Sequence, residues 1–263
     1  MSKIPNSEQT LELLINCKTY PAISKKYIET VCTGGVQVDG TFVRLYPIPF
    51  RFLEREEQYK RWDIIQVRAY KDTKDRRPES WHLIHGTPIN IVKSLTTDKQ
   101  RWEWMNKAVF QGAEDLESQG KTNGLVEIEP IEFYWQPDKK EWTPSQIKTL
   151  SQGSLFDSKD KMAQLATRVP WQFRLKYREK VTGREDDGKV LAWSNYQGYL
   201  RFSKDTGDEN VALEMVADKV RRSIFSKDKT VYAILGTHSR FGHWMISGLY
   251  HLPTKIQRQG CLL

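Results

Sequence analysis

The stretch Cys32-Thr-Gly-Gly-Val-Gln-Val-Asp-Gly-Thr-Phe-Val-Arg-Leu-Tyr-Pro47 carries the clearest local signal in the chain. It places Asp39-Gly40 between two segments in which apolar and polar residues alternate. Asp-Gly tolerates the positive φ angles of a tight turn, so residues 36–38 and 41–46 are expected to pair as an antiparallel hairpin. Because alternation is typical of strands with one buried face, this stretch indicates a fold built on antiparallel sheet.

The segments around this hairpin extend the same pattern. Two helices are expected. The first begins with a capping box at Thr97 and Gln100 and runs to Leu116. The second spans residues 208–225 and begins with a capping box at Thr206 and Glu209. A short helix begins at Pro144, and residues 181–188 read as a loop. Further strands are expected at 11–17, 62–70, 89–95, 125–134, 171–179, 189–202, 230–236 and 244–252. The sequence predicts a β-rich α+β fold, with two small antiparallel sheets or OB-like barrels and two main helices.

The charge divides the chain unevenly. Residues 1–135 carry 19 Lys or Arg and 19 Asp or Glu, whereas residues 136–263 carry 22 and 14, so the whole excess of +8 lies in the second half. We expect a β-rich, OB-like domain over 1–135, a connector over 136–168 and a basic α+β domain over 169–263. Such asymmetry favours a polyanionic partner, although a solvated surface rich in lysine is the simpler alternative.

Composition excludes several classes of protein. The chain of 263 residues is 38% hydrophobic, which is enough to bury a core, and it has no apolar run of the roughly 18 residues that a membrane span needs. The first residues lack the apolar run of a secretory signal. Three cysteines, Cys17, Cys32 and Cys261, are too few and too scattered for a disulfide scaffold or a metal cluster. We expect a soluble cytoplasmic protein without a cofactor.

The opening hairpin resembles that of a group of bacterial proteins with two OB-type barrels, found among defence and mobile-element genes. In that group a Cys-x-Ala-Gly-Ile strand leads to an aromatic-Ile-Arg strand; here Cys32-Thr-Gly-Gly-Val36 leads to Phe42-Val-Arg-Leu-Tyr-Pro47. The chain departs from the pattern at Gly34 and at Leu45-Tyr46. The resemblance implies an OB-like barrel and nucleic-acid binding, and it assigns no catalytic residue.

A basic strip is expected in the second half. Between Trp171 and Arg178 large apolar residues alternate with polar or basic ones, which puts Arg174, Lys176 and Arg178 on the outward side of one strand. Aromatic residues nearby can stack bases or fill the core. The turn at 237–243 offers small and cationic donors for a phosphate. The candidate nucleic-acid-binding residues are Arg174, Lys176, Arg178, Lys189, Arg201, Arg222, His238 and Arg240.

The leading hypothesis is a non-catalytic nucleic-acid-binding module, for DNA rather than RNA, in a bacterial defence or DNA-processing system. A metal-dependent nuclease is the alternative, because His82 and His85 lie three residues apart downstream of Asp72 and Asp75. In a strand these two histidines point to opposite faces, however, and the flanking residues favour a loop. Glu127 and Glu129 are a weaker candidate for a Mg²⁺ site.

An adaptor that binds only protein is the third possibility. Gln152-Gly-Ser-Leu-Phe156 resembles the peptide by which bacterial replication and repair proteins dock on the sliding clamp, with Gln152, Leu155 and Phe156 as its contact residues.

Overall fold

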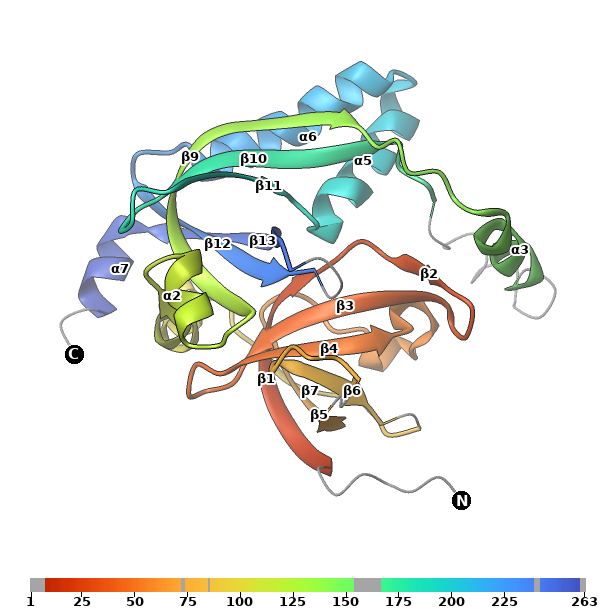
Figure 1. Cartoon of the computed structure of the whole chain (residues 1–263), viewed down its shortest axis with the longest axis horizontal. Helices are drawn as coiled ribbons and strands as arrows, with labels where there is room; N and C mark the ends of the chain where they lie inside the picture. Colours follow the sequence, from red (N-terminus) through yellow and green to blue (C-terminus); the bar gives the residue numbers. More distant parts are fainter. Residues whose placement is uncertain (1–7, 72–73, 85, 154–166, 239–241, 261–263) are drawn as a thin grey trace.

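The first sheet closes on itself as a five-stranded barrel (Figure 1). The computed structural model describes residues 8–71, 74–84, 86–153, 167–238 and 242–260. The barrel runs in the order β1-β3-β4-β6-β5, and β5 pairs again with β1. All of these pairings are antiparallel except that between β4 and β6. Counted along the chain, the strand order is 1-2-3-5-4-1, that of an OB-type barrel. The strands of this sheet are β1 Glu8–Lys18, β2 Ala22–Ser24, β3 Ile28–Val36, β4 Phe42–Ile48, β5 Asp63–Lys71, β6 Ser80–Leu83 and β7 Asn90–Ser94.

The predicted hairpin is confirmed as β3 and β4. Val36 pairs with Phe42, and the turn between them is held by the backbone N–H of Thr41, which donates to Asp39 Oδ1 at 2.9 Å. Gly40 has a φ of +92°, which only glycine adopts at little cost. The sequence therefore set the register of this hairpin through its turn.

The second sheet has the same connectivity. It runs β11-β10-β9-β12-β13, and a parallel bridge between Val190 and Ile246 links the segment after β11 to β13. We call this sheet the second barrel. Residues 123–137, assigned above mostly to the first domain, belong to this sheet. The α+β, OB-like fold class expected from the sequence is confirmed. The strands are β8 Val109–Phe110, β9 Asn123–Pro137, β10 Trp171–Glu179, β11 Glu185–Lys189, β12 Lys229–Thr237 and β13 Trp244–Pro253.

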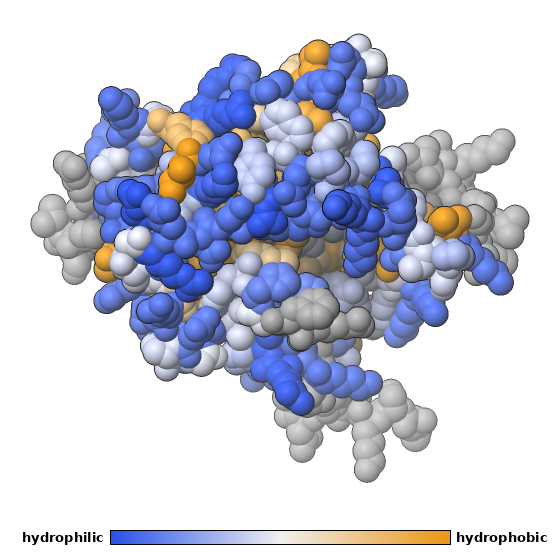
Figure 2. Space-filling model, turned by 45° about the horizontal axis from the view of Figure 1, so that its top comes forward, coloured by the Kyte–Doolittle hydropathy of each residue, from blue (hydrophilic) through white to orange (hydrophobic). Residues whose placement is uncertain are grey.

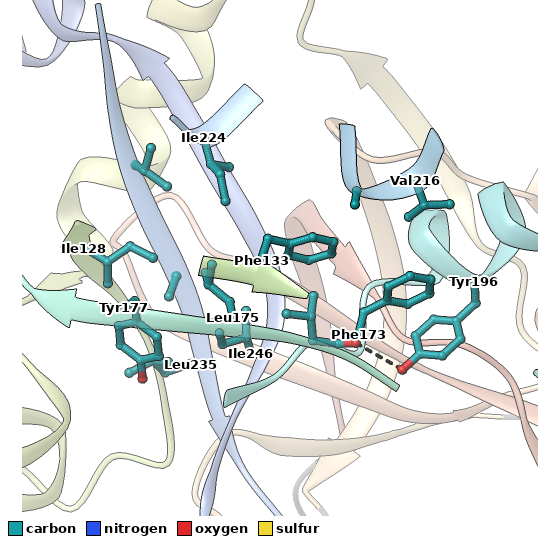
Figure 3. Packing of buried hydrophobic residues seen from close by; sticks show 14 of the residues in the cluster. Ile128, Phe133, Phe173, Leu175, Tyr177, Tyr196, Val216, Ile224, Leu235 and Ile246 are labelled. Carbon is teal, nitrogen blue, oxygen red and sulfur yellow. Dashed lines mark hydrogen bonds between the residues drawn. The ribbon is translucent and has the colours of Figure 1, made fainter. Parts of the chain in front are cut away.

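Two helices between β11 and β12 cover the second sheet: α5 Trp193–Thr206 and α6 Glu209–Ile224. Figure 3 shows their contact with the sheet, where Phe173 stacks on Phe133 with ring centroids 6.0 Å apart. The Tyr196 hydroxyl donates to the carbonyl of Val190 at 3.2 Å, which satisfies the one polar group that this ring brings into the core. The expected buried face of β10 is therefore confirmed at Phe173, Leu175 and Tyr177.

The two sheets are joined by a third apolar cluster. Leu14 of β1 and Phe42 of β4 face outward from the first barrel and pack in one cluster with Tyr232 of β12 and Tyr250 of β13. Trp102 of helix α1, Asp98–Met105, closes this cluster. The remaining elements are short: the 3₁₀ turns Phe50–Phe52, Arg55–Glu57 and Asn106–Ala108, and the helices α2 Ala113–Ser118, α3 Pro144–Gly153 and α7 Thr254–Gly260. In the described part of the chain, no helix is long and apolar enough to span a membrane.

The predicted helix from Thr97 to Leu116 is interrupted after Met105, and a separate helix, α2, begins at Ala113. Val109 and Phe110 leave the helix and pair in parallel with β9, and Gly112 then has an extended backbone. A side chain at Gly112 would meet the carboxylate of Glu179, whose Oε1 accepts a hydrogen bond from the N–H of Ala113. Sheet pairing and this carboxylate override the helical spacing of the sequence.

Residues 189–202 were expected to form a strand, and this prediction is also wrong. Only Lys189 belongs to a strand, while helix α5 begins at Trp193. Tyr196 and Tyr199 lie three residues apart on the buried side of the helix, so helical spacing brings both into the core. Two smaller corrections concern the neighbouring elements. Residues 185–189 form β11 rather than a loop, and Asp208, not Thr206, caps α6 by accepting from the N–H groups of Asn210 and Val211.

The core of the second sheet offers a test of this packing. We expect Phe173→Ala to lower the free energy of unfolding by about 3–5 kcal/mol, because a fully buried ring is lost and a cavity remains. Urea denaturation measures this loss. Val181→Ala serves as the control, since Val181 is 64% exposed and its truncation changes stability by less than about 0.5 kcal/mol. Equal effects of the two substitutions contradict the packing described here.

Candidate nucleic-acid interface

The basic side chains of β10 lie on its solvent side, but acidic neighbours neutralise them. Arg174 Nε lies 3.1 Å from Asp187 Oδ1, and Lys176 Nζ lies 2.6 Å from Glu132 Oε2. Arg178 Nη2 lies 2.5 Å from Glu185 Oε1. The partners come from the adjacent strands β9 and β11.

These ion pairs reduce the positive charge expected of Arg174, Lys176 and Arg178, which we call the β10 strip. Exposed ion pairs of this kind contribute little stability, about 0–1 kcal/mol each, but they cancel the charge of both partners at a distance. Lys180 is paired in the same way with Glu129. The surface in Figure 2 is largely hydrophilic, and its hydrophobic residues form small separate patches. The β10 strip therefore lacks the excess positive charge that would draw a phosphodiester chain.

The other candidate residues lie in three different places. Arg201 is exposed on α5, and Arg222 of α6 has a side chain that is 82% exposed, with Asp218 Oδ2 at 4.0 Å. Arg240 lies outside the described residues. Lys189 and His238, by contrast, line one cleft between the two barrels. Of the predicted residues outside β10, the structure therefore places only Lys189 and His238 in the same site.

The cleft has a volume of about 470 Å³ and is lined by both barrels. The first barrel supplies residues of the loop after β1, of β3 and β4, and of the loop between β5 and β6. The second barrel supplies the segment after β9, the end of β11 and the ends of β12 and β13. In OB-type barrels the ligand-binding face consists of the second and third strands with the 1–2 and 4–5 loops. The first barrel therefore presents its usual binding face to this cleft. The second barrel contributes its 1–2 and 4–5 loops and the end of its third strand, β11, but no residue of its second strand, β10.

Arg44 of β4 is the unusual residue of the cleft. Its side chain is buried, with 5% of the residue exposed, and its Nη1 has no hydrogen-bond partner. It makes no ion pair with a carboxylate of the described residues, although Asp75 and Glu79 act on it electrostatically from farther away, and burial lowers the pKa of its guanidinium. A buried guanidinium without a paired anion is costly, so this position is one that an anionic ligand would stabilise.

Gly236 of β12 makes room for this guanidinium. A Cβ atom at this position would lie 3.2 Å from Arg44 Nη2 and 3.1 Å from Ser247 Oγ, closer than ordinary contact. Glycine therefore allows the backbone of the second sheet to approach the arginine of the first barrel.

Most of the remaining charges of the cleft are held by ion pairs. Arg77 Nη1 donates to the carbonyl of Thr237 at 2.9 Å, and its Nη2 lies 2.5 Å from Asp75 Oδ2. Arg168 pairs with Glu141, and Lys189 pairs with Asp138. The cleft is lined by five cations and two carboxylates: Arg44, Arg77, Lys140, Arg168 and Lys189, against Asp138 and Glu141. The lining is thus positive overall.

Part of this cleft has a recognisable signal in the sequence. Phe42, Arg44 and Tyr46 alternate along one strand, so they share a face, and an arginine between two aromatic residues on one face is a candidate binding residue. Arg77 and Arg168 had no such signal, because they approach Arg44 only through the tertiary fold.

The residues of the catalytic alternative are dispersed. His82 lies in β6, not in a loop, and stacks on Tyr70 with ring centroids 5.3 Å apart. His85 lies outside the described residues. Within the residues that the structure describes, no group of three or more His, Cys, Asp or Glu is placed to hold a metal ion. Glu129 pairs with Lys180, while Glu127 lies beside the hydroxyl of Tyr232 at 3.5 Å.

Cys32 and the clamp-like peptide complete the candidates. Cys32 lines the cleft, and burial raises the pKa of its thiol, which keeps it protonated and a poor nucleophile. Leu155 and Phe156 lie outside the described residues, and Gln152 is described only by its backbone, in α3.

Comparison with known families agrees with the two-part architecture. The chain belongs to the family described as Domain of unknown function (DUF8757), whose model matches residues 105–262. A second model, Domain of unknown function (DUF8758), matches residues 9–111. The two matches overlap only at residues 105–111, which precede β9. No curated protein matches the chain.

The burial of Arg44 has a measurable consequence for stability. We expect Arg44→Met to raise the free energy of unfolding by about 1–3 kcal/mol, because methionine fills similar space without a desolvated charge. Arg77→Met should lower it, since Asp75 then loses its partner. Urea denaturation at pH 7 without nucleic acid compares the two variants. A loss of stability in Arg44→Met as large as that in Arg77→Met contradicts the unpaired state of Arg44.

The Asp75–Arg77 pair predicts a pH dependence. Burial disfavours the charged carboxylate, but hydrogen bonds from Arg77 and Ser80 outweigh it and lower the pKa of Asp75 to about 2. The ionised carboxylate thus stabilises the fold above its unfolded pKa of about 3.9, and this contribution is lost as the pH falls toward 2. Asp75→Asn should be less stable than the natural protein at pH 7, and the difference should shrink between pH 4 and pH 2. Thermal melts across this range test the sign; a constant difference contradicts it.

Proposed function

We propose that the protein is a nucleic-acid-binding module without catalytic activity of its own, and that a single strand, DNA in preference to RNA, binds in the cleft between the two barrels. The observation that carries this proposal is Arg44, a buried guanidinium without an ion pair at the wall of a positively lined cleft. A backbone phosphate in the cleft supplies an anion close to this guanidinium, and a charge-assisted contact stabilises the buried charge.

The position of the cleft supports the same ligand. The outward faces of β3 and β4 and the loops around them are the parts of an OB-type barrel that hold oligonucleotides, and they face loops of the second barrel across the cleft. A cleft of about 470 Å³ has room for one or two nucleotides of a single strand, while a duplex is too wide to enter it.

Aromatic side chains at the cleft suit unpaired bases. Tyr46 is 42% exposed on β4, and Trp142 is half-buried on the opposite wall. Rings beside a cationic groove stack bases at about 1–3 kcal/mol each, without regard to sequence. The Thr30 hydroxyl donates to the Tyr46 hydroxyl at 3.3 Å and fixes the ring at its polar end.

Three further features belong to the proposal. The protein acts in the cytoplasm as a component of a bacterial defence or DNA-processing system, in keeping with the resemblance of its opening hairpin. The peptide around Gln152, Leu155 and Phe156 offers a route to the sliding clamp.

Binding of a fluorescent single-stranded DNA, measured by anisotropy at two salt concentrations, tests the proposal. Arg44→Met should weaken binding about tenfold, the effect of losing one charge-assisted contact of about 1.4 kcal/mol, and should reduce the salt dependence. Arg222→Met is the control, because it removes the same charge from an exposed helix position.

The same assay separates the cleft from the β10 strip. Reversal of Arg174, Lys176 and Arg178 to Glu should weaken binding less than Arg44→Met does. The proposal is rejected if Arg44→Met and Arg222→Met bind alike. Cleavage of the strand in the presence of Mg²⁺ favours the nuclease instead.

A further inference from the structure

A second cavity, of about 300 Å³, lies between the first barrel and the helices α5 and α6. Its walls come from the end of β1, the first turn of α5, one face of α6 and the middle of β13. It shares no lining residue with the cleft described above. Its volume is at the lower end of the range of about 300–1,000 Å³ that is typical of small-molecule sites.

The charged residues that line this cavity are all cations: Lys18, Arg61 and Lys219. In the described part of the chain, none of them has a carboxylate within ion-pair distance, in contrast to the basic residues of β10. Lys18 Nζ donates to the carbonyl of Tyr59 at 2.8 Å and lies 3.8 Å from the centroid of the Phe50 ring. Arg61 Nη2 donates to the carbonyl of Leu249 at 2.7 Å. Two of the three cations are thus held in place by neutral groups.

The beginning of α5 adds to this positive potential. Ala192, Trp193, Ser194 and Asn195 line the cavity, and no side chain caps the helix there. The first N–H groups of a helix carry a partial positive charge and are a common site for phosphate. The end of α5, with Gly207 in the left-handed region, lies a whole helix length away.

Most of the remaining lining is apolar or aromatic, with Ser223 and His251 as exceptions. Trp193 and Phe202 of α5 and Val220 of α6 are half-buried there, and Val216 of α6 is buried. Asn16 of β1 also borders the cavity but is fully buried, and its Oδ1 lies beside Gly34 of β3. A ligand that fits this lining combines an anionic group with a flat ring.

We propose that this cavity binds a nucleoside monophosphate. Its phosphate lies among Lys18, Arg61 and the first turn of α5, and its base packs on the apolar side of the cavity, against Trp193. The site is separate from the nucleic-acid cleft, and it provides a place where a free nucleotide binds at the junction of the two barrels.

Isothermal titration of the full chain with adenosine and guanosine monophosphates tests this site. At least one nucleotide should bind with a dissociation constant below about 1 mM. The matching nucleoside and inorganic phosphate should each bind at least tenfold more weakly, since each provides half of the contacts. Equal binding of inorganic phosphate and the nucleotide overturns the assignment, as does the absence of binding by both nucleotides.

Variants on the two helices locate the site. Lys219→Glu should weaken nucleotide binding at least tenfold, whereas Lys204→Glu, the same charge reversal on an exposed turn of α5 outside the cavity, should not. Gly198→Leu fills the cavity without changing charge and should also abolish binding. Circular dichroism and thermal melts confirm that these variants are folded. If Lys219→Glu and Lys204→Glu behave alike, the site is not in this cavity.

The outcome is independent of the proposed nucleic-acid function. Arg44→Met leaves the cavity untouched and should retain nucleotide binding, while Lys219→Glu should retain most of its affinity for single-stranded DNA. Loss of both activities in either variant contradicts the separation of the two sites.

Discussion

The arrangement of the molecule depends on the burial of β1 on both of its faces. Leu13 and Ile15 point into the first barrel, whereas Leu14 and Cys17 point outward into the apolar cluster shared with the second sheet. The hydrophobic effect is proportional to the apolar area removed from water, so the outer face of this barrel can be stable only against a partner. The second sheet is that partner. The cleft and the smaller cavity are each lined by residues of both barrels. Both therefore exist only because the two barrels pack together.

Ion pairing decides which of the many basic residues can act on a ligand. Arg174 and Lys176 lie on an open strand, yet carboxylates on the neighbouring strands neutralise them. Arg44 lies in a less accessible place, but no carboxylate of the described residues forms an ion pair with it. A net charge of +8 says nothing about this distinction, because the field at a point depends on the nearest charges and on how far water screens them.

The parts of the fold that could be predicted were those specified locally. The Asp39-Gly40 turn, the alternation along β10 and the capping box at Thr97 each involve residues close in sequence, and all were found as expected. The errors arose where distant residues decide. β11 is stabilised by pairing with β10, and the helix after Met105 is broken by pairing with β9. Of the candidate site, Lys189 and His238 were foreseen; Arg77 and Arg168 reach the cleft only because both barrels fold around it.

The same reasoning explains why Arg44 is a better indicator of function than the basic strip. Pairing of exposed charges costs the fold almost nothing, so it arises on many surfaces and carries no information about a ligand. Burial of a guanidinium without a carboxylate lowers the stability of the chain, and a protein that is only marginally stable retains such a cost when the residue serves another purpose. Gly236 points the same way, because a glycine in a strand has no side chain to pack, and near the end of β12 it leaves room for the guanidinium. Two residues from different barrels, each unfavourable for stability by itself, thus meet at one point of the cleft, and an anion bound there makes both of them favourable.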